Sequence, residues 1–131
     1  MCLYIDNYKH KLDKNRVPLP MIMKNDRVVW KVIREDNCSV YQKFVYRENT
    51  EYGSEELNAR YSYLGEGIQS IHYVNEGYHA YTTRKFARLC RFSRMEKIVK
   101  FVIPEGAKYY IGCLGDIVSD QIRSLDLRHC R

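Results

Sequence analysis

The stretch GYHAYTTRKFARLCRFSRMEKIVK, residues Gly77 to Lys100, carries the strongest local structural signals of the chain. Its first part, Tyr78 to Tyr81, suits a short strand, because a tyrosine ring fits a half-buried sheet surface. Thr82 or Thr83 then serves as a helix N-cap, since its hydroxyl accepts from free amides of the first turn. Apolar residues follow at helical spacing and predict one main helix over about residues 83–93, with a buried stripe of Phe86, Leu89 and Cys90.

Most of the chain on either side of this stretch has the pattern of β-strands. The clearest is RVVWKVIR, residues 27–34, in which alternate residues face opposite ways and Lys31 shares a face with Val29 and Ile33. Because both faces carry apolar residues, we expect this strand in the centre of a sheet. The other expected strands span residues 1–5, 39–46, 57–64, 68–74, 98–103 and 108–111.

This order of elements predicts an α+β fold. We expect one small domain over residues 1–131, with a mostly antiparallel sheet and a single main helix. Residues 6–25 contain two prolines and form an irregular connection along the surface. His10 lies in this connection and His129 near the end of the chain, so we expect both to be exposed.

The composition argues against several classes of protein. With 45% hydrophobic and 13% aromatic residues, the chain has enough apolar side chains to form a folded core. No apolar run approaches the ~18 residues of a membrane span, and the first residues lack signal-peptide features, so we expect a cytoplasmic protein without a membrane partner. The five cysteines lack C-x-x-C spacing, which argues against a disulfide framework or a zinc site. Metal and nucleotide-loop motifs are missing too, and we expect no cofactor.

Positive charge is concentrated between Arg84 and Lys100. This segment holds seven basic residues and one acid, an excess that equals the formal net charge of +6 of the whole chain. Within the expected helix, three arginines recur at i, i+4 and i+7. We expect this face to meet an anionic partner, either a nucleic acid, a nucleotide or a host protein, through Arg84, Arg88 and Arg91. The alternative is neutralisation within the fold by the acids between Glu48 and Glu76.

His79 is the leading candidate for a ligand-binding side chain. It lies in a strand directly before a helix N-terminus, where free amides and positive potential favour phosphate or carboxylate groups. Tyr81 and Thr83 lie close enough in sequence to contribute to the same site. Two alternatives stay open: a packed strand histidine that bonds a neighbouring carbonyl, and a catalytic pair of His79 with Cys90.

Several motifs together resemble a group of short proteins from gut bacteria of the Bacteroides type, their phages and their mobile elements. The most specific are EGYHAYTT at residues 76–83 and IPEGAKYYIG at residues 103–112. MCLYI at the start, VYQ at residues 40–42 and DIVS at residues 116–119 occur in the same order, so that the resemblance spans most of the chain. It implies a binding protein of phage or mobile-element type, and a counter-defence role by association.

A second likeness covers a shorter part of the chain. Residues 78–87, a strand followed by a helix that contains Phe-Ala, are similar to the middle of ADP-ribosyltransferase-like domains. The segment from Asp116 to Ile122 is similar to the part that carries their catalytic glutamate, with an aspartate in its place. The likeness implies a pocket formed by His79, Thr83 and Asp116 that binds a nucleotide, with or without turnover.

Three functions thus stay open at the level of sequence. The first is a non-enzymatic binding protein for an anionic ligand or a host protein. The second is an ADP-ribosyltransferase-like enzyme or a degenerate nucleotide pocket. The third is a structural or oligomerisation module whose charges are satisfied internally or at an interface.

Overall fold

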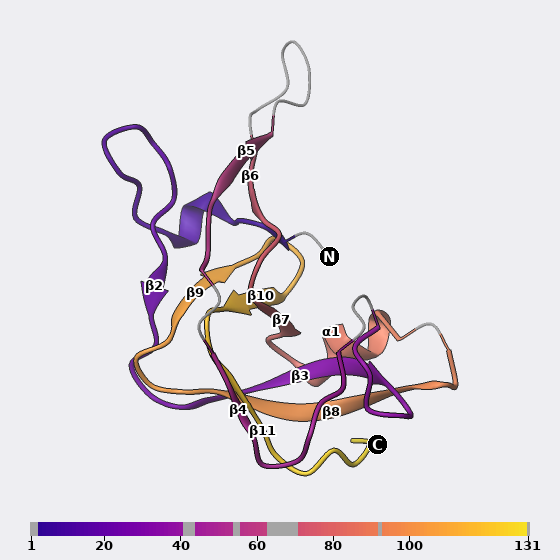
Figure 1. Ribbon diagram of the computed structural model, residues 1–131. Helices are drawn as coiled ribbons and strands as arrows, with labels where there is room; N and C mark the ends of the chain where they lie inside the picture. Colours follow the sequence, from indigo (N-terminus) through magenta and orange to yellow (C-terminus); the bar gives the residue numbers. More distant parts are fainter. Residues whose placement is uncertain (1–2, 41–43, 54–55, 63–70, 92, 131) are drawn as a thin grey trace.

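In the part of the chain that the structure describes, eight antiparallel strands form one sheet (Figure 1). The computed structural model describes residues 3–40, 44–53, 56–62, 71–91 and 93–130. The two longest strands, β3 (Arg27–Arg34) and β8 (Glu96–Ile103), pair along their whole length. The other strands of this sheet are β2 (Met21–Ile22), β4 (Glu51–Tyr52), β7 (Tyr78–Tyr81), β9 (Lys108–Ile111), β10 (Asp116–Ser119) and β11 (Ile122–Ser124).

The strand order across this sheet is β2-β9-β10-β7-β3-β8-β11-β4, which places β3 in the interior as expected. A smaller sheet has the order β1-β6-β5 and rises above one end of the large one (Figure 1). Its strands are β1 (Leu3–Tyr4), β6 (Ile71–Val74) and β5 (Arg60–Ser62), and a short 3₁₀ turn, η1 (Asn7–Lys9), follows β1.

Each face of the large sheet has its own apolar cluster. One face carries the main core, in which Val29 and Ile33 of β3 pack with Phe101 of β8 and Ile117 of β10. On the other face, a cluster beneath the small sheet contains Leu3, Ile5, Val74, Tyr110 and Val118. Alternation along β3 is consistent with burial of this face, because Val29 and Ile33 are fully buried while Val28 is exposed.

The single α-helix among the described residues is α1 (Arg84–Leu89), which begins at the expected place but is shorter than the predicted 83–93. Thr83 is its N-cap and accepts a hydrogen bond of 3.2 Å from the Phe86 amide. The helix ends at Cys90 because β8 must begin at Glu96 to pair with Arg34.

The predicted buried stripe of the helix is wrong. Phe86 and Leu89 are 39% and 67% exposed, and Cys90 is half-buried. The fully buried residue is Ala87, which packs with Tyr81 and Ile98. A helix of less than two turns contacts the sheet through one small side chain, so that its large apolar residues stay at the margin.

The predicted strand over residues 39–46 is wrong as well, although residues 41–43 lie outside the described ones. Asn37, with φ of 67°, reverses the chain after β3. The segment then folds on itself: the Ser39 amide donates to the Phe44 carbonyl at 2.8 Å, and Cys38 bridges Val45. Its backbone hydrogen bonds are therefore used within the segment, and Phe44 and Tyr46 lie against the main core.

Two histidines that we expected to be exposed instead complete the backbone hydrogen bonding of the sheet. His10 is buried, and its ring accepts from the Ile111 amide at 3.0 Å. His129 is half-buried, and its Nδ1 accepts from the Ile98 amide at 2.9 Å. A buried backbone amide without a hydrogen-bond acceptor lowers the stability of the fold, which explains why both rings lie inside it.

The structure is dominated by its sheets, with 44% of the residues in strands and 8% in helices. The prediction of a small domain with a mostly antiparallel sheet is confirmed at this coarser level. Among the described residues, no helix has both the length and the apolar character that a membrane crossing requires.

Candidate functional site

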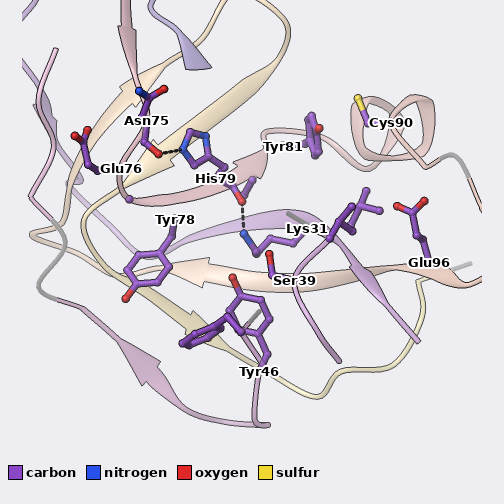
Figure 2. Close-up of a pocket in the computed structure, with 15 residues that line it drawn as sticks. Lys31, Ser39, Tyr46, Asn75, Glu76, Tyr78, His79, Tyr81, Cys90 and Glu96 are labelled. Carbon is purple, nitrogen blue, oxygen red and sulfur yellow. Dashed lines mark hydrogen bonds between the residues drawn. The ribbon is translucent and has the colours of Figure 1, made fainter. Parts of the chain in front are cut away.

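A cavity of about 360 Å³ opens where β3 and β7 part (Figure 2). The two strands are in register at one residue pair, Trp30↔Tyr81, and the cavity lies beyond it. Its walls are Lys31 and Val32 of β3, residues 75–81, and the segment after β3 that contributes Ser39, Phe44 and Tyr46. The backward fold of that segment thus closes one side of the cavity.

Lys31 is the most unusual side chain of this site. It is 8% exposed, and its ammonium donates to the backbone carbonyl of His79 across the gap between the strands (Figure 2). The nearest rings are those of Tyr46 and Phe101, with centroids 5.5 and 5.8 Å from Nζ. None of the ion pairs found among the described residues includes Lys31. Burial lowers the pKa of the Lys31 ammonium to about 8.

Aromatic rings and hydroxyl groups surround this ammonium. The Tyr46 ring makes edge contacts with Phe44, Tyr52 and Phe101, with centroids 5.0 to 5.5 Å apart. Figure 2 shows the hydroxyls of Ser39 and Tyr46 directed toward the same space as Lys31 Nζ. Burial raises the pKa of the Tyr46 phenol, so this hydroxyl keeps its proton and donates hydrogen bonds.

His79, which the sequence singled out as a candidate ligand-binding residue, lines the cavity, but its ring is not a charged ligand group. Its Nε2 lies 3.4 Å from the Asn75 carbonyl, which agrees with the alternative of a strand histidine bonded to a neighbouring carbonyl. Burial, followed by the nearby charge of Lys31, lowers the pKa of His79 to about 4. The ring is therefore neutral at pH 7. What His79 supplies to Lys31 is its backbone carbonyl.

The other predicted site residues separate into two groups. Tyr81 and Cys90 line the cavity with His79, whereas Thr83 and Asp116 are not part of its wall. Thr83 is committed to the helix cap. Asp116 lies opposite Tyr81 on the neighbouring strand and accepts from the Leu114 amide at 3.2 Å, and burial raises the pKa of its carboxyl.

The three predicted arginines do not lie on one helix face. Arg84 and Arg88 belong to α1, but Arg91 follows the helix, and its Nε donates to the Glu96 carbonyl at 2.9 Å. The basic segment is divided further, since Lys97 is buried in β8 and donates to the Leu127 carbonyl at 2.7 Å. Among the described residues, no ion pair joins Arg84 or Arg88 to an acid, so the alternative of internal neutralisation finds no support there.

Neither a chelating group nor a strong catalytic pair emerges from the described residues. No group of three His, Cys, Asp or Glu side chains there could hold a metal ion. His79 and Cys90 line the same cavity, but no hydrogen bond between them is present in that part of the chain. The chemistry of the site therefore centres on Lys31.

Sequence reasoning missed Lys31, although a signal was present. Lys31 alternates with Val29 and Ile33 on one face of RVVWKVIR. A lysine on the same face of an interior strand as two apolar residues must be buried or must line a cavity.

No protein-family model, no curated protein and no solved structure gives a significant match to this chain. The resemblance to proteins of gut bacteria and their phages therefore stays a prediction, as does the likeness to ADP-ribosyltransferase-like domains. The functional argument rests on the cavity and its charges.

Proposed function

We propose that this chain is a binding protein that takes a small aromatic anion, such as an aromatic carboxylate or a nucleotide, into the cavity at Lys31. The observation that carries the proposal is a buried ammonium in a cavity wall that forms no ion pair with a carboxylate of the described residues. A buried charge without a counter-charge is costly, and an anionic ligand would remove that cost.

The walls of the cavity favour a ligand with an aromatic body. Phe44, Tyr46, Tyr78 and Tyr81 present rings to the space, and aromatic groups pack against such rings edge-on or offset. The ammonium has three donors, of which the His79 carbonyl takes one, and no other hydrogen bond joins it to the described residues, which leaves two donors for the oxygen atoms of an anionic ligand. The hydroxyls of Ser39 and Tyr46 would add further donors beside it.

The size and charge of the cavity limit the ligand further. A volume of about 360 Å³ lies at the lower end of small-molecule sites, which span ~300–1,000 Å³. Two acids also line the cavity, and one of them, Glu76, is paired with Arg60. Glu96, the other, is buried at the start of β8. We therefore expect the ligand to place its single anionic group at Lys31 and its apolar part against the rings.

Binding of 8-anilinonaphthalene-1-sulfonate tests this function, because the dye has an aromatic body and one sulfonate. We expect the wild type to bind it with enhanced fluorescence and Lys31→Met to lose at least ten-fold in affinity. That loss corresponds to about 1.4 kcal/mol, the lower end of a charge-assisted hydrogen bond.

Lys97→Met is the matched control, since it removes a second buried lysine of the same sheet that does not line the cavity. Its dye affinity should stay within two-fold of the wild type. Equal binding by the wild type and Lys31→Met, with both proteins cooperatively folded in thermal unfolding, would overturn the proposed site.

A second candidate function is nucleic-acid binding, favoured by the lack of acidic partners for Arg84 and Arg88 among the described residues. If it is correct, affinity for labelled RNA or DNA falls steeply with salt. Alanine at Arg84, Arg88 and Arg91 together then lowers the slope of log K against log[salt] by about 2 to 3.

A matched control for that experiment is the triple alanine variant of Lys11, Lys14 and Lys24, which removes the same charge from exposed positions elsewhere. It should leave the slope nearly unchanged. Equal effects of the two triple variants would indicate non-specific attraction to a basic protein, and absence of binding at low salt would exclude this function.

A further inference from the structure

We propose that the Lys31 amine forms an imine with aldehydes or ketones that enter the cavity, which makes small aromatic carbonyl compounds covalent ligands of this protein. The inference rests on the proposed function, because it uses the same cavity. It adds a reaction and a second class of ligand at the same nitrogen: an acid would bind as an ion pair, and a carbonyl compound as an imine.

The position of the amine supports this reaction. Lys31 Nζ lies in the wall of the cavity, held by one hydrogen bond to the His79 carbonyl. An amine that is fixed at one point, with its remaining face toward a cavity, is oriented for attack on a bound carbonyl carbon. No carboxylate of the described residues forms an ion pair with it, so no counter-charge there stabilises the ammonium form.

The surroundings also favour the neutral amine, which is the nucleophile. The rings of Tyr46 and Phe101 take the place of water on one side of the nitrogen. With a pKa of about 8, roughly a tenth of the lysine is neutral at pH 7, against well below 1% for an ordinary lysine. The titratable groups that share the cavity wall are Glu76, Glu96, His79, Cys90, Tyr46, Tyr78 and Tyr81.

The reaction proceeds in two balanced steps. The lone pair of Nζ attacks the carbonyl carbon, a C–N bond forms, and the carbonyl oxygen takes up a proton to give a carbinolamine. The carbinolamine hydroxyl then takes up a second proton and leaves as water, and the C=N bond of the imine forms. Over the two steps, the two protons of the neutral amine are transferred to the oxygen that leaves as water. The hydroxyls of Ser39 and Tyr46 are directed toward this space and would donate hydrogen bonds to the oxygen as its charge develops.

Reductive trapping with 2-naphthaldehyde and sodium borohydride tests the inference on the full chain. Borohydride supplies a hydride to the imine carbon and converts it to a stable secondary amine, which intact-mass and peptide-mass measurements locate. At pH 8 and limiting aldehyde we expect singly labelled chains, with the adduct at least ten-fold enriched at Lys31 over any other lysine. Labelling at Lys31 should rise between pH 7 and pH 9, as the neutral fraction increases.

Two variants make the outcome specific. Lys31→Arg retains a positive charge, and Lys31→Met replaces the lysine stem by an unbranched apolar chain without the amine. Neither variant forms a reducible imine at this position, so both should lose the single adduct. Lys97→Arg should keep it at Lys31. Labelling spread evenly over the lysines of the folded wild type would overturn the inference.

The failure of this inference can be told apart from failure of the proposed function. Wild type that binds 8-anilinonaphthalene-1-sulfonate through Lys31 but gives no Lys31 adduct would refute imine formation and keep the ionic site. An adduct at Lys31 without dye binding would refute the anion site and keep the reactive amine. Thermal unfolding of each variant verifies that it is folded before labelling.

Discussion

Between pH 7 and about pH 9.5 the wild type should gain about 2 kcal/mol in free energy of unfolding relative to Lys31→Met. The reason is that burial lowers the pKa of Lys31 from 10.5 to about 8 in the folded protein. Between these two values the unfolded chain binds more protons than the folded one, so stability rises with pH in that window. Well below pH 8 both states are protonated, and the cost of burying the ammonium is present in full.

Urea unfolding at pH 7, 8 and 9.5, followed by circular dichroism, measures this difference. The comparison with Lys31→Met matters, because Tyr46 acts in the opposite direction: its raised pKa keeps a proton in the folded state and lowers stability above about pH 10. Lys97→Met should retain the rise of the wild type. A wild-type profile parallel to that of Lys31→Met would show that Lys31 is not buried as an unpaired amine.

Replacing Gly77 by alanine should destabilise the protein by about 3 kcal/mol or more. Gly77 precedes β7 with φ of 87°, a conformation that costs a residue with a Cβ ~1–2 kcal/mol. An added Cβ would also lie 2.8 Å from the Ser119 carbonyl oxygen and 2.5 Å from a Leu57 methyl group. Ser119 is the last residue of β10 and is paired with Tyr78 of β7 and Tyr109 of β9, so that relief of this contact requires movement of the sheet.

Gly106→Ala separates the two contributions. Gly106 has nearly the same φ, 88°, but a Cβ added there meets nothing within 4 Å. Its substitution should therefore cost only the backbone part, about 1 kcal/mol. Thermal or urea unfolding of the two variants gives the difference directly, and equal losses would contradict the close packing at Gly77. Because Gly77 also lines the cavity, its variant should bind the dye more weakly, whereas Gly106→Ala should not.

The part of the site that lies within one continuous segment could be predicted. His79 and Tyr81 were expected from GYHAYTT, and both line the cavity. Thr83 was grouped with them because it lies close in sequence and Asp116 through a family likeness, yet the structure places both outside the cavity wall. The helix cap at Thr83 was foreseen because capping depends on neighbouring amides alone.

Lys31 could not be predicted as a site residue from local sequence, because its surroundings come from distant segments. Its carbonyl partner belongs to His79, 48 residues away in the sequence. The aromatic wall beside it comes from a segment that we expected to be a regular strand, but which folds on itself after Asn37. Neither fact follows from local pattern, because both depend on how β3, β7 and the following segment pack.

By itself, the sequence determined the features that arise from local chemistry: an antiparallel, sheet-dominated domain, the strand over residues 27–34, the strand at Tyr78–Tyr81, and the start of one helix. Side-chain alternation and capping act over a few residues, so they can be read from the chain. Only the tertiary structure decided that the helix is short, that Arg91 lies beyond the helix that carries Arg84 and Arg88, and that Lys31 lines a cavity without an ion pair to any acid of the described residues. These outcomes depend on strand register and on where β3 and β7 part, which are set by contacts between residues far apart in the sequence.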